Sequence, residues 1–486
     1  MITLPVLIPL LGATVYATVG WRRGTAWVSA ICSAGLLGVA IAIAVDIARS
    51  GPREFGGLVR VDALSAFMLI VVGAVAMLAT LAAPGHLETE IRLGRASART
   101  AARHSLLVQL FLATMACAVL AANLGLLWVA IEATTIVTAF LVGQRRTRAA
   151  IEAAWKYVVI CSTGIALALL GTLLLNYASS RAPSRAGLDL AALAGAHGLD
   201  PGVTRIAIAL LLLGFGAKAG LAPLHAWLPD AHSQAPAPVS ALMSGVLLSV
   251  AFYAILRIKV VADAVLGAGF ARWLLAVMAI ASLAVAASLL LAQQDYKRML
   301  AYSSIEHLGL VALGAAIGGP IAIAAILLHI LGHGLAKGVL FVGAGRMLQL
   351  TGTSRIDGVR GLLARAPVLA SCVGLGVLAL IGLPPFSVFA SELGIVRAGF
   401  ASPLGWVTAL ALTLVLVAAA ALTGHTSGML LGPAPDGPSA AVARPRLLPV
   451  PTAFALAGGL TVAAVLGVAA PGLSTLLRLA AEVLTR

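Results

Sequence analysis

This sequence has few charged residues for its length. Only 10% of its 486 residues are charged, whereas 61% are hydrophobic, and the mean hydropathy is +1.06. A soluble domain carries about 25% charged residues, so this chain has too few to cover a water-facing surface. The composition therefore excludes a soluble enzyme and a disordered chain. It also excludes a membrane β-barrel, whose alternating pattern gives much lower hydrophobicity.

Cysteine is also scarce, and no CxxC pair occurs. The chain has four cysteines, all inside apolar runs and far apart in the sequence: Cys32, Cys117, Cys161 and Cys372. Iron–sulfur and zinc sites need closely grouped thiolates. We therefore expect no cofactor, no metal and no redox centre in this chain.

The net charge of +15 shows that acidic residues are scarcer than basic ones. In a soluble protein this excess would suggest nucleic acid as a partner. In a membrane protein, arginines in cytoplasmic loops explain it better. We expect a lipid bilayer and no nucleic acid around this chain.

Long apolar runs predict an all-α polytopic membrane protein with about fourteen transmembrane helices, since each crossing takes about 20 residues. The N-terminus lacks a basic region ahead of its first apolar run, which predicts a retained helix rather than a cleaved signal. The predicted spans cover residues 2–20, 26–45, 62–83, 105–122, 124–142, 155–177, 203–222, 238–257, 270–292, 301–318, 320–345, 366–395, 404–423 and 451–470.

Basic residues are unevenly shared between the two sides of the predicted membrane. The side that carries Arg22, Arg23 and the cluster 145–148 has the excess. The positive-inside rule makes that side cytoplasmic and leaves both termini outside. We expect the plasma membrane of a prokaryote.

Two of the predicted spans are interrupted by glycine and proline. Residues 212–238 read LLGFGAKAGLAPLHAWLPDAHSQAPAP, and residues 379–396 read ALIGLPPFSVFASELGIV. Broken helices at matching places in two halves indicate inverted repeats around a midplane ion site. We therefore divide the chain into helices 1 and 2 (residues 1–60), two five-helix repeats (61–232 and 233–400) and two C-terminal helices (401–486).

Ionisable residues inside the predicted spans are the candidate functional residues, because an isolated charge in hydrocarbon costs at least about 2.5 kcal/mol. Of the five lysines, three fall within spans, whereas no arginine lies in mid-span. A buried lysine can release its proton and an arginine cannot, so this division favours a proton pathway. The candidate residues are Glu132, Lys156, Lys218, His225, His329, His333, Lys337 and Glu392.

The residues His329, His333 and Lys337 recur every four positions and share one helix face. Groups about 6 Å apart on such a face could pass a proton along. Structural hydrogen bonding is the alternative. A metal site is a third interpretation, which we reject because no third ligand is close in sequence.

The other candidates keep an alternative as well. Lys156 follows Glu152 near a helix start and could be a lysine that reaches the membrane surface. His225, with Asp230 and His232, follows the first break and faces either a wet cavity or the cytoplasmic surface. Glu306 and His307 open a span and serve either in proton uptake or in an interfacial hydrogen bond.

Three long motifs resemble the antiporter-like membrane subunits of respiratory complex I and of Mrp sodium/proton antiporters. They are GFGAKAGLAPLHAWLPDAHSQAPAPVSALMSGVLL, QQDYKRMLAYSSIEHLGLVALG and GLPPFSVFASE. The form SSIEHLG looks most like the membrane component F of hydrogenase-4 and of formate-hydrogenlyase-like complexes. The resemblance covers roughly residues 60–400 and implies fourteen helices with two inverted repeats.

The resemblance also implies roles for individual residues. Glu132 would pair with Lys218, and Lys156 would match the lysine of a KY motif. The span-11 face would hold His329, His333 and Lys337, and Glu392 would be the distal ionisable group. The sequence departs from its relatives at Ser249, where many have lysine, and serine cannot store a proton near neutral pH.

These observations predict a proton-translocating membrane subunit of a hydrogenase-like or complex I-like oxidoreductase. The chain itself would be non-catalytic, with redox chemistry in a peripheral arm and with other membrane subunits as partners. The alternatives are a component of a sodium/proton antiporter without redox partners, which would move sodium, and a membrane scaffold that does not pump.

Overall fold

The computed structural model describes residues 1–433, 448–469 and 471–485, and almost all of them are helical. The long helices are α1 (Leu4–Thr18), α2 (Val28–Ser50), α3 (Ala63–Arg92), α4 (Ala98–Leu120), α5 (Leu124–Val142), α6 (Arg148–Arg181), α8 (Pro201–Ala219), α11 (Leu248–Leu266), α12 (Ala268–Leu291), α13 (Tyr296–Ile317), α14 (Gly319–Thr351), α16 (Pro367–Leu380), α17 (Ser387–Phe400), α18 (Gly405–Leu431), α19 (Val450–Val468) and α20 (Pro471–Thr485). The short ones are α7 (Leu190–Ala194), α9 (Trp227–Gln234), α10 (Ala237–Leu242) and α15 (Leu362–Arg365).

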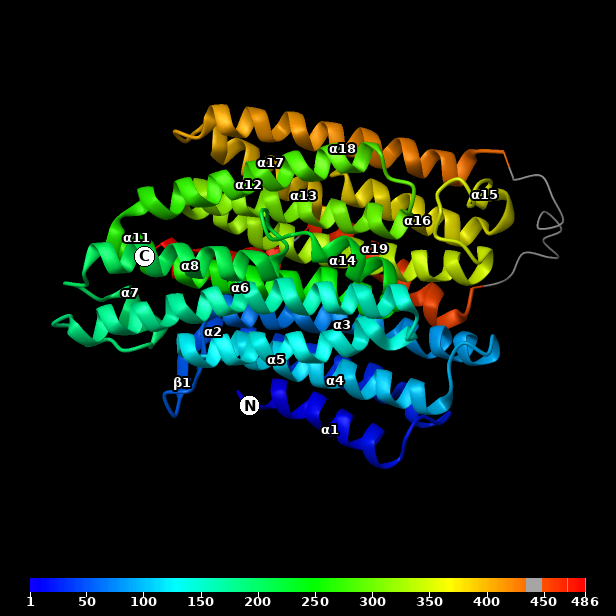
Figure 1. Cartoon of the computed structure of the whole chain (residues 1–486), viewed down its shortest axis with the longest axis horizontal. Coiled ribbons are helices and arrows are strands. Elements are labelled where there is room, and N and C mark those ends of the chain that lie inside the picture. Colours follow the sequence, from blue (N-terminus) through cyan, green and yellow to red (C-terminus); the bar gives the residue numbers. More distant parts are fainter. Residues whose placement is uncertain (434–447, 470, 486) are drawn as a thin grey trace.

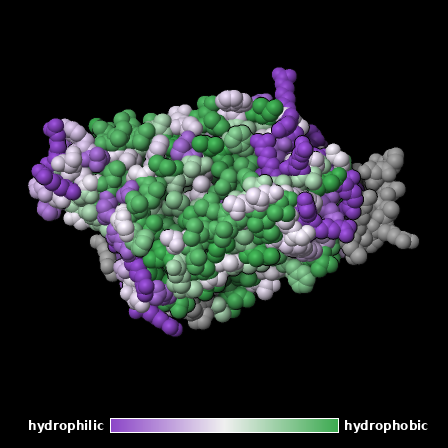
Figure 2. Space-filling model, turned by 90° about the horizontal axis from the view of Figure 1, so that it is seen from below, coloured by the Kyte–Doolittle hydropathy of each residue, from purple (hydrophilic) through white to green (hydrophobic). Residues whose placement is uncertain are grey.

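The architecture confirms an all-α polytopic membrane protein. Within the described ranges, 12 helical segments are long and apolar enough to cross a membrane, and α1 and α16 are shorter apolar helices. The helices run side by side along the long axis of the molecule (Figure 1). On the face shown in Figure 2, hydrophobic residues cover the middle and hydrophilic residues gather towards the two ends, as a bilayer requires. The count of fourteen crossings, the inverted repeats and the domain limits stay predictions.

Local sequence signals explain where many helices begin. The side chains of Asp62, Asn123, Thr147 and Asp295 each accept a hydrogen bond from a backbone N–H in the first turn of α3, α5, α6 and α13. Such caps satisfy N–H groups that have no partner within the helix. These capping residues therefore account for the starts of α3, α5, α6 and α13.

The centre of the bundle is formed by α3, α13, α14 and the continuous segment α10–α11. Every residue in the most apolar window of α13 and of α10–α11 is buried. A π-helical turn (Met243–Leu247) joins α10 to α11. There Gly245 packs against Gly334 of α14, and an added Cβ on Gly245 would lie 3.1 Å from the Gly334 carbonyl oxygen. Small residues thus bring these two helices close together.

Both predicted interruptions are real breaks, and they share one backbone form. The helix α8 ends at Gly220 (φ +78°) and α16 ends just before Gly382 (φ +68°), and each glycine is followed two residues later by a cis peptide bond to proline. The N–H after each glycine bonds back to a carbonyl five residues earlier, from Leu221 to Gly216 and from Leu383 to Leu378. This is a Schellman-type helix end, which needs a left-handed residue.

Two features of the fold were not predicted. A small antiparallel hairpin pairs β1 (Arg53–Phe55) with β2 (Val59–Val61) ahead of α3. The amphipathic helix α20 follows α19 and packs against α3 and α14. Residue 470, the last of the fourteenth predicted span, lies outside the described residues.

Candidate functional site

The first polar cluster surrounds Lys218, which lies fully buried in the last turn of α8, directly before the break. Its Nζ donates hydrogen bonds to Thr135 Oγ1 and to the Tyr157 hydroxyl, both at 2.7 Å. Its ammonium also lies 4.8 Å from the centre of the Tyr157 ring. A cation at a helix C-terminus is stabilised by the helix dipole, so the break itself provides a place for this lysine.

Glu132 does not contact Lys218 directly, because the hydroxyl of Thr135 lies between the two members of the predicted pair. The hydroxyl of Thr135 donates to Glu132 Oε2 at 3.0 Å and accepts from Lys218, so it lies between the two charges. Glu132 is only partly buried, whereas Thr135 on the same helix is buried. The sequence signal for this bridge is that Thr135 follows Glu132 by three residues and so shares its helix face.

Lys156 lies at the surface and is not part of the buried cluster. Its side chain is 47% exposed and forms ion pairs with Glu152 at 2.8 Å and Asp230 at 3.0 Å. Asp230 also pairs with Arg298 of α13 at 2.7 Å. This position fits the alternative in which Lys156 is a surface lysine, and it leaves a pathway role as a prediction.

The histidines after the first break lie at different depths. His225, in the connection between α8 and α9, is partly buried. His232, at the end of α9, is completely buried and stacks on Phe341 of α14, with ring centres 4.8 Å apart. The prediction that His232 faces a wet cavity or the surface was wrong, because α9 turns back into the bundle.

The second polar cluster lies on α14, and the predicted helix face is buried over its full length. His329, His333 and Lys337 are each at most 1% exposed. Lys337 Nζ donates to the Leu300 carbonyl at 2.6 Å and to the Ser303 hydroxyl, both on α13. The face therefore points towards α13 rather than towards lipid.

A third histidine, His307 of α13, completes this cluster. Its Nδ1 lies 3.0 Å from His329 Nε2, and its ring centre lies 5.0 Å from that of His333. Glu306 beside it is 3% exposed, with Oε2 3.7 Å from His307 Nε2. The prediction that these two residues open a span was wrong, because α13 begins ten residues earlier, at Tyr296.

Glu392 approaches the same cluster from α17. Its carboxylate lies against the second break, where a Cβ added to Gly382 would collide with Glu392 Oε2. One ligand atom each of His307, His329 and Glu392 lie within 4.8 Å of one another. The metal interpretation of His329 and His333 was rejected for want of a third ligand in the sequence; the structure instead groups His329 with His307 of α13 and Glu392 of α17.

Ser249 does not join the two clusters through its hydroxyl. It is buried, and its Oγ donates to the Gly245 carbonyl of its own helix at 3.0 Å. A different hydroxyl pair, Ser244 and Ser304, joins the π-helical turn to α13 at 2.9 Å. Hydroxyls, and not a lysine, therefore occupy the space between the two halves at this level.

Lys297 lies between two predicted spans, yet it is a buried cation. It is 1% exposed, and its Nζ donates to the carbonyls of Ser233 at 2.8 Å and Ala235 at 2.7 Å, where α9 ends. A lysine at the C-terminal end of a helix satisfies carbonyls that lack a partner. A lysine outside the predicted spans can therefore be as buried as Lys218 and Lys337 inside them.

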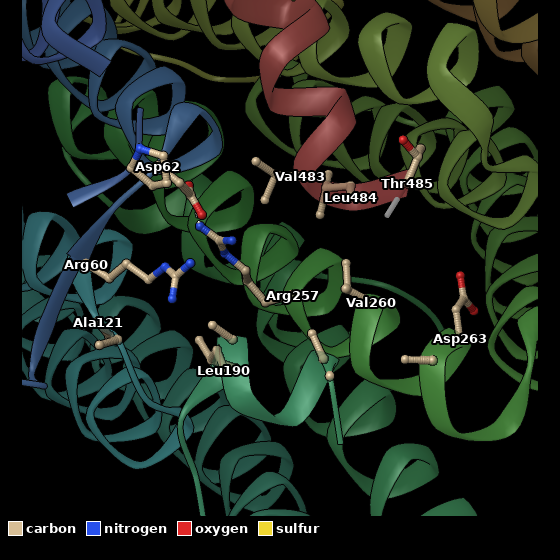
Figure 3. A pocket seen from close by; sticks show the side chains of 16 residues that line it. Arg60, Asp62, Ala121, Leu190, Arg257, Val260, Asp263, Val483, Leu484 and Thr485 are labelled. Carbon is tan, nitrogen blue, oxygen red and sulfur yellow. Dashed lines mark hydrogen bonds and ion pairs between the residues drawn. The ribbon is translucent and has the colours of Figure 1, made fainter. Parts of the chain in front are cut away.

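A cavity of about 470 Å³ lies near the hairpin and the end of α20. Figure 3 shows Arg60, Asp62 and Arg257 around it, with Asp263 at its other side. Arg257 bonds to Asp62 at 2.7 Å and to the Tyr253 hydroxyl at 3.1 Å. Most of its charged wall is thus internally paired, and Arg257 lies about two turns of α11 from Ser249.

Comparison with known proteins agrees with this geometry. Residues 121–418 match the family described as NADH:quinone oxidoreductase/Mrp antiporter, TM. The hydrogenase-4 component F homolog of Methylacidiphilum infernorum (isolate V4) is 37% identical over 85% of this chain and 88% of its own length.

Two solved structures share the fold. A chain of the archaeal membrane-bound sulfane sulfur reductase matches with a TM-score of 0.85 at 25% identity, over 100% of this chain and 98% of its own. A chain of the Mrp complex from Dietzia sp. DQ12-45-1b also matches with a TM-score of 0.85, at 22% identity, over 100% of this chain and 97% of its own.

Proposed function

This chain belongs to the NADH:quinone oxidoreductase/Mrp antiporter membrane family, and from that premise we propose that it is the proton-translocating, antiporter-like subunit of a hydrogenase-like or complex I-like oxidoreductase. The observation that carries the proposal is a buried, titratable cluster beside each broken helix. One is centred on Lys218 and the other on His329, His333 and Lys337.

Each cluster supplies groups that can hold a proton away from water. Lys218 has a hydroxyl on either side, and Thr135 connects it to Glu132 at the edge of the bundle. A change of charge at Glu132 would therefore alter the field at Lys218 through a single hydroxyl. In the second cluster, His307 lies in contact with His329 and beside His333, which provides alternative positions for one proton.

The chain would act without a cofactor of its own. Redox chemistry would take place in a peripheral arm, and other membrane subunits would hold this one in a prokaryotic plasma membrane with both termini outside. The solved complexes that share its fold, the sulfane sulfur reductase and the Mrp complex, support a place within a larger membrane assembly.

A second candidate is a sodium/proton antiporter component without redox partners, which the likeness to the Mrp complex favours at the level of fold. Ser249, in place of the lysine of many relatives, would weaken proton storage between the two halves in either case. The hydrogenase-4 component F homolog is 37% identical to this chain, against 22% for the chain of the Mrp complex, which favours the oxidoreductase.

The test is purification of the intact complex, identification of its subunits by mass spectrometry, and measurement of proton uptake in proteoliposomes during coupled turnover. A nickel–iron hydrogenase-like large subunit and proton uptake that Lys218→Ala abolishes would support the proposal. A set of small membrane subunits alone, with ²²Na⁺ movement, would establish the antiporter instead.

A further inference from the structure

We propose that His307, His329 and Glu392 form a binding site for a zinc-like transition-metal ion inside the second polar cluster. Their ligand atoms lie within 4.8 Å of one another and come from α13, α14 and α17. Two imidazoles and one carboxylate are a common donor set for Zn²⁺. The proposal concerns metal binding and does not depend on the proposed proton pathway.

The separations are close to those of a bound ion. Tetrahedral zinc with bonds of about 2.0–2.1 Å places its ligand atoms about 3.4 Å apart. His307 Nδ1 and His329 Nε2 are 3.0 Å apart, so they need little movement. The Glu392 carboxylate belongs to the same group of ligand atoms within 4.8 Å and needs to move closer, which rotation about its side-chain bonds can supply.

The hydrogen bonds around His329 fix which of its nitrogens is free. Ser391 donates its one hydroxyl proton to the Val388 carbonyl at 2.7 Å, so its Oγ must accept from His329 Nδ1 at 3.0 Å. Neutral His329 then carries its proton on Nδ1 and presents a lone pair on Nε2, the atom that faces His307. This assignment follows from the network of partners.

His307 has a buried nitrogen, Nε2, without a hydrogen-bond partner, and metal binding would change its protonation. Without an ion, His307 Nδ1 must donate to His329 Nε2, which leaves His307 Nε2 buried with no hydrogen-bond partner. If Nδ1 binds an ion, the proton of neutral His307 resides on Nε2 instead, 3.7 Å from Glu306 Oε2. A carboxylate behind a ligating histidine is the usual second shell of a zinc site.

Charge, a further ligand and access also favour an ion here. The two carboxylates Glu306 and Glu392, when ionised, would balance the two positive charges of the metal in a buried place. His333 lies beside His307 with its Nε2 buried without a partner, but it lies outside the group of close ligand atoms, so a water molecule is the expected fourth ligand. Glu392 is partly exposed and lines a cavity of about 20 Å³ with Leu310 and Thr408, room for about one water molecule.

The test is metal binding by the full chain in its membrane complex, reconstituted in nanodiscs, with Co²⁺ as a spectroscopic probe and Zn²⁺ as competitor. The wild type should bind one Co²⁺ per chain at this site, show the visible absorption of four-coordinate Co²⁺, and lose it when Zn²⁺ is added. His307→Gln, His329→Gln and Glu392→Gln should each remove this absorption.

Two controls separate the site from binding elsewhere on the chain. His197→Gln, at an exposed residue, should behave as the wild type. Glu306→Gln should weaken binding about 10–100-fold, as loss of a second-shell carboxylate does, without abolishing it. Glu392→Gln changes a partly exposed group to a similar shape, and an unchanged elution profile will show that it folds.

Several outcomes would overturn the proposal. They are absence of Co²⁺ absorption in the wild type, retention of full binding by Glu392→Gln, or equal loss in His197→Gln. If the site exists and the proposed pathway is correct, Zn²⁺ should also inhibit proton uptake in the wild type. Metal binding without inhibition would count against the pathway and leave the site intact.

Discussion

The first interrupted helix, α8–α9, and the second, α16–α17, turn at corresponding residues but surround the turn with different side chains. The sequences GLAP and GLPP both place a left-handed glycine at the helix end and a proline three residues later. Lys218 precedes the first break, whereas no ionisable residue lies in the last turn of α16. Instead Glu392 reaches the second break from the helix that follows it.

This difference separates what the backbone supplies from what the side chains supply. A broken helix exposes backbone carbonyls and N–H groups within the membrane, and polar side chains must gather there. In the first half one lysine and two hydroxyls are enough. In the second half three histidines, a lysine and two carboxylates from α13, α14 and α17 occupy the equivalent space. The two breaks thus share a backbone form, while the side chains around them differ.

The largest effect is expected for Lys218→Ala. The first cluster has one buried ammonium, so its loss should reduce proton uptake in proteoliposomes to background while the complex still assembles. Lys218→Arg should fail too, because arginine keeps its proton. Normal uptake in either variant would show that the first break is structural.

A smaller but clear effect is expected in the second half, where several groups share the proton. Lys337→Ala and His333→Ala should each reduce coupled proton uptake at least about tenfold, as removal of a positioned proton carrier commonly does. The matched control is His197→Ala, an exposed histidine outside both clusters. If the three variants are alike, the buried face of α14 is not a relay.

The next largest effect is expected from substitutions that break the link between Glu132 and Lys218 through Thr135. Because Thr135 joins Glu132 to Lys218, Glu132→Gln and Thr135→Val should each lower the rate, and the double variant should be little worse than the poorer single one. A coupling of about 0.5–3 kcal/mol is usual for residues in one network. If the free-energy effects of the two single substitutions add up in the double variant, the two charges do not communicate through this hydroxyl.

Alanine substitutions of the two glycines at the breaks, Gly220 and Gly382, should lower the Tm similarly but affect Co²⁺ binding differently. Gly220→Ala and Gly382→Ala both force a Cβ into a left-handed residue, which costs about 1–2 kcal/mol, so similar falls in Tm are expected. Only at Gly382 would the new Cβ meet the Glu392 carboxylate, whereas at Gly220 it meets Leu228. Binding of Co²⁺ by the proposed metal site should therefore weaken in Gly382→Ala and not in Gly220→Ala.

The smallest effect is expected for Lys156→Ala. Its side chain is 47% exposed and pairs with the exposed Glu152 and the partly buried Asp230, and ion pairs at the surface contribute about 0–1 kcal/mol. Proton uptake and Tm should stay close to those of the wild type. A loss as severe as that of Lys218→Ala would restore Lys156 to the pathway and extend the first cluster to the surface.

The sequence by itself determined the membrane class, most helices, both breaks and the buried face of α14. These features depend on local rules: run length, glycine and proline at a helix end, and the recurrence of residues every four positions on one face. The same rules identified Lys218 as a buried lysine, because it lies between apolar residues directly before a break.

Only the tertiary structure decided which helices meet. It placed Thr135 between Glu132 and Lys218, moved Glu306, His307 and His232 into the interior, and buried Lys297 against the end of α9. It also brought His307, His329 and Glu392 together from three helices. Helical periodicity fixes the face on which a residue lies but not the neighbour that this face contacts, since that depends on packing between segments far apart in the chain.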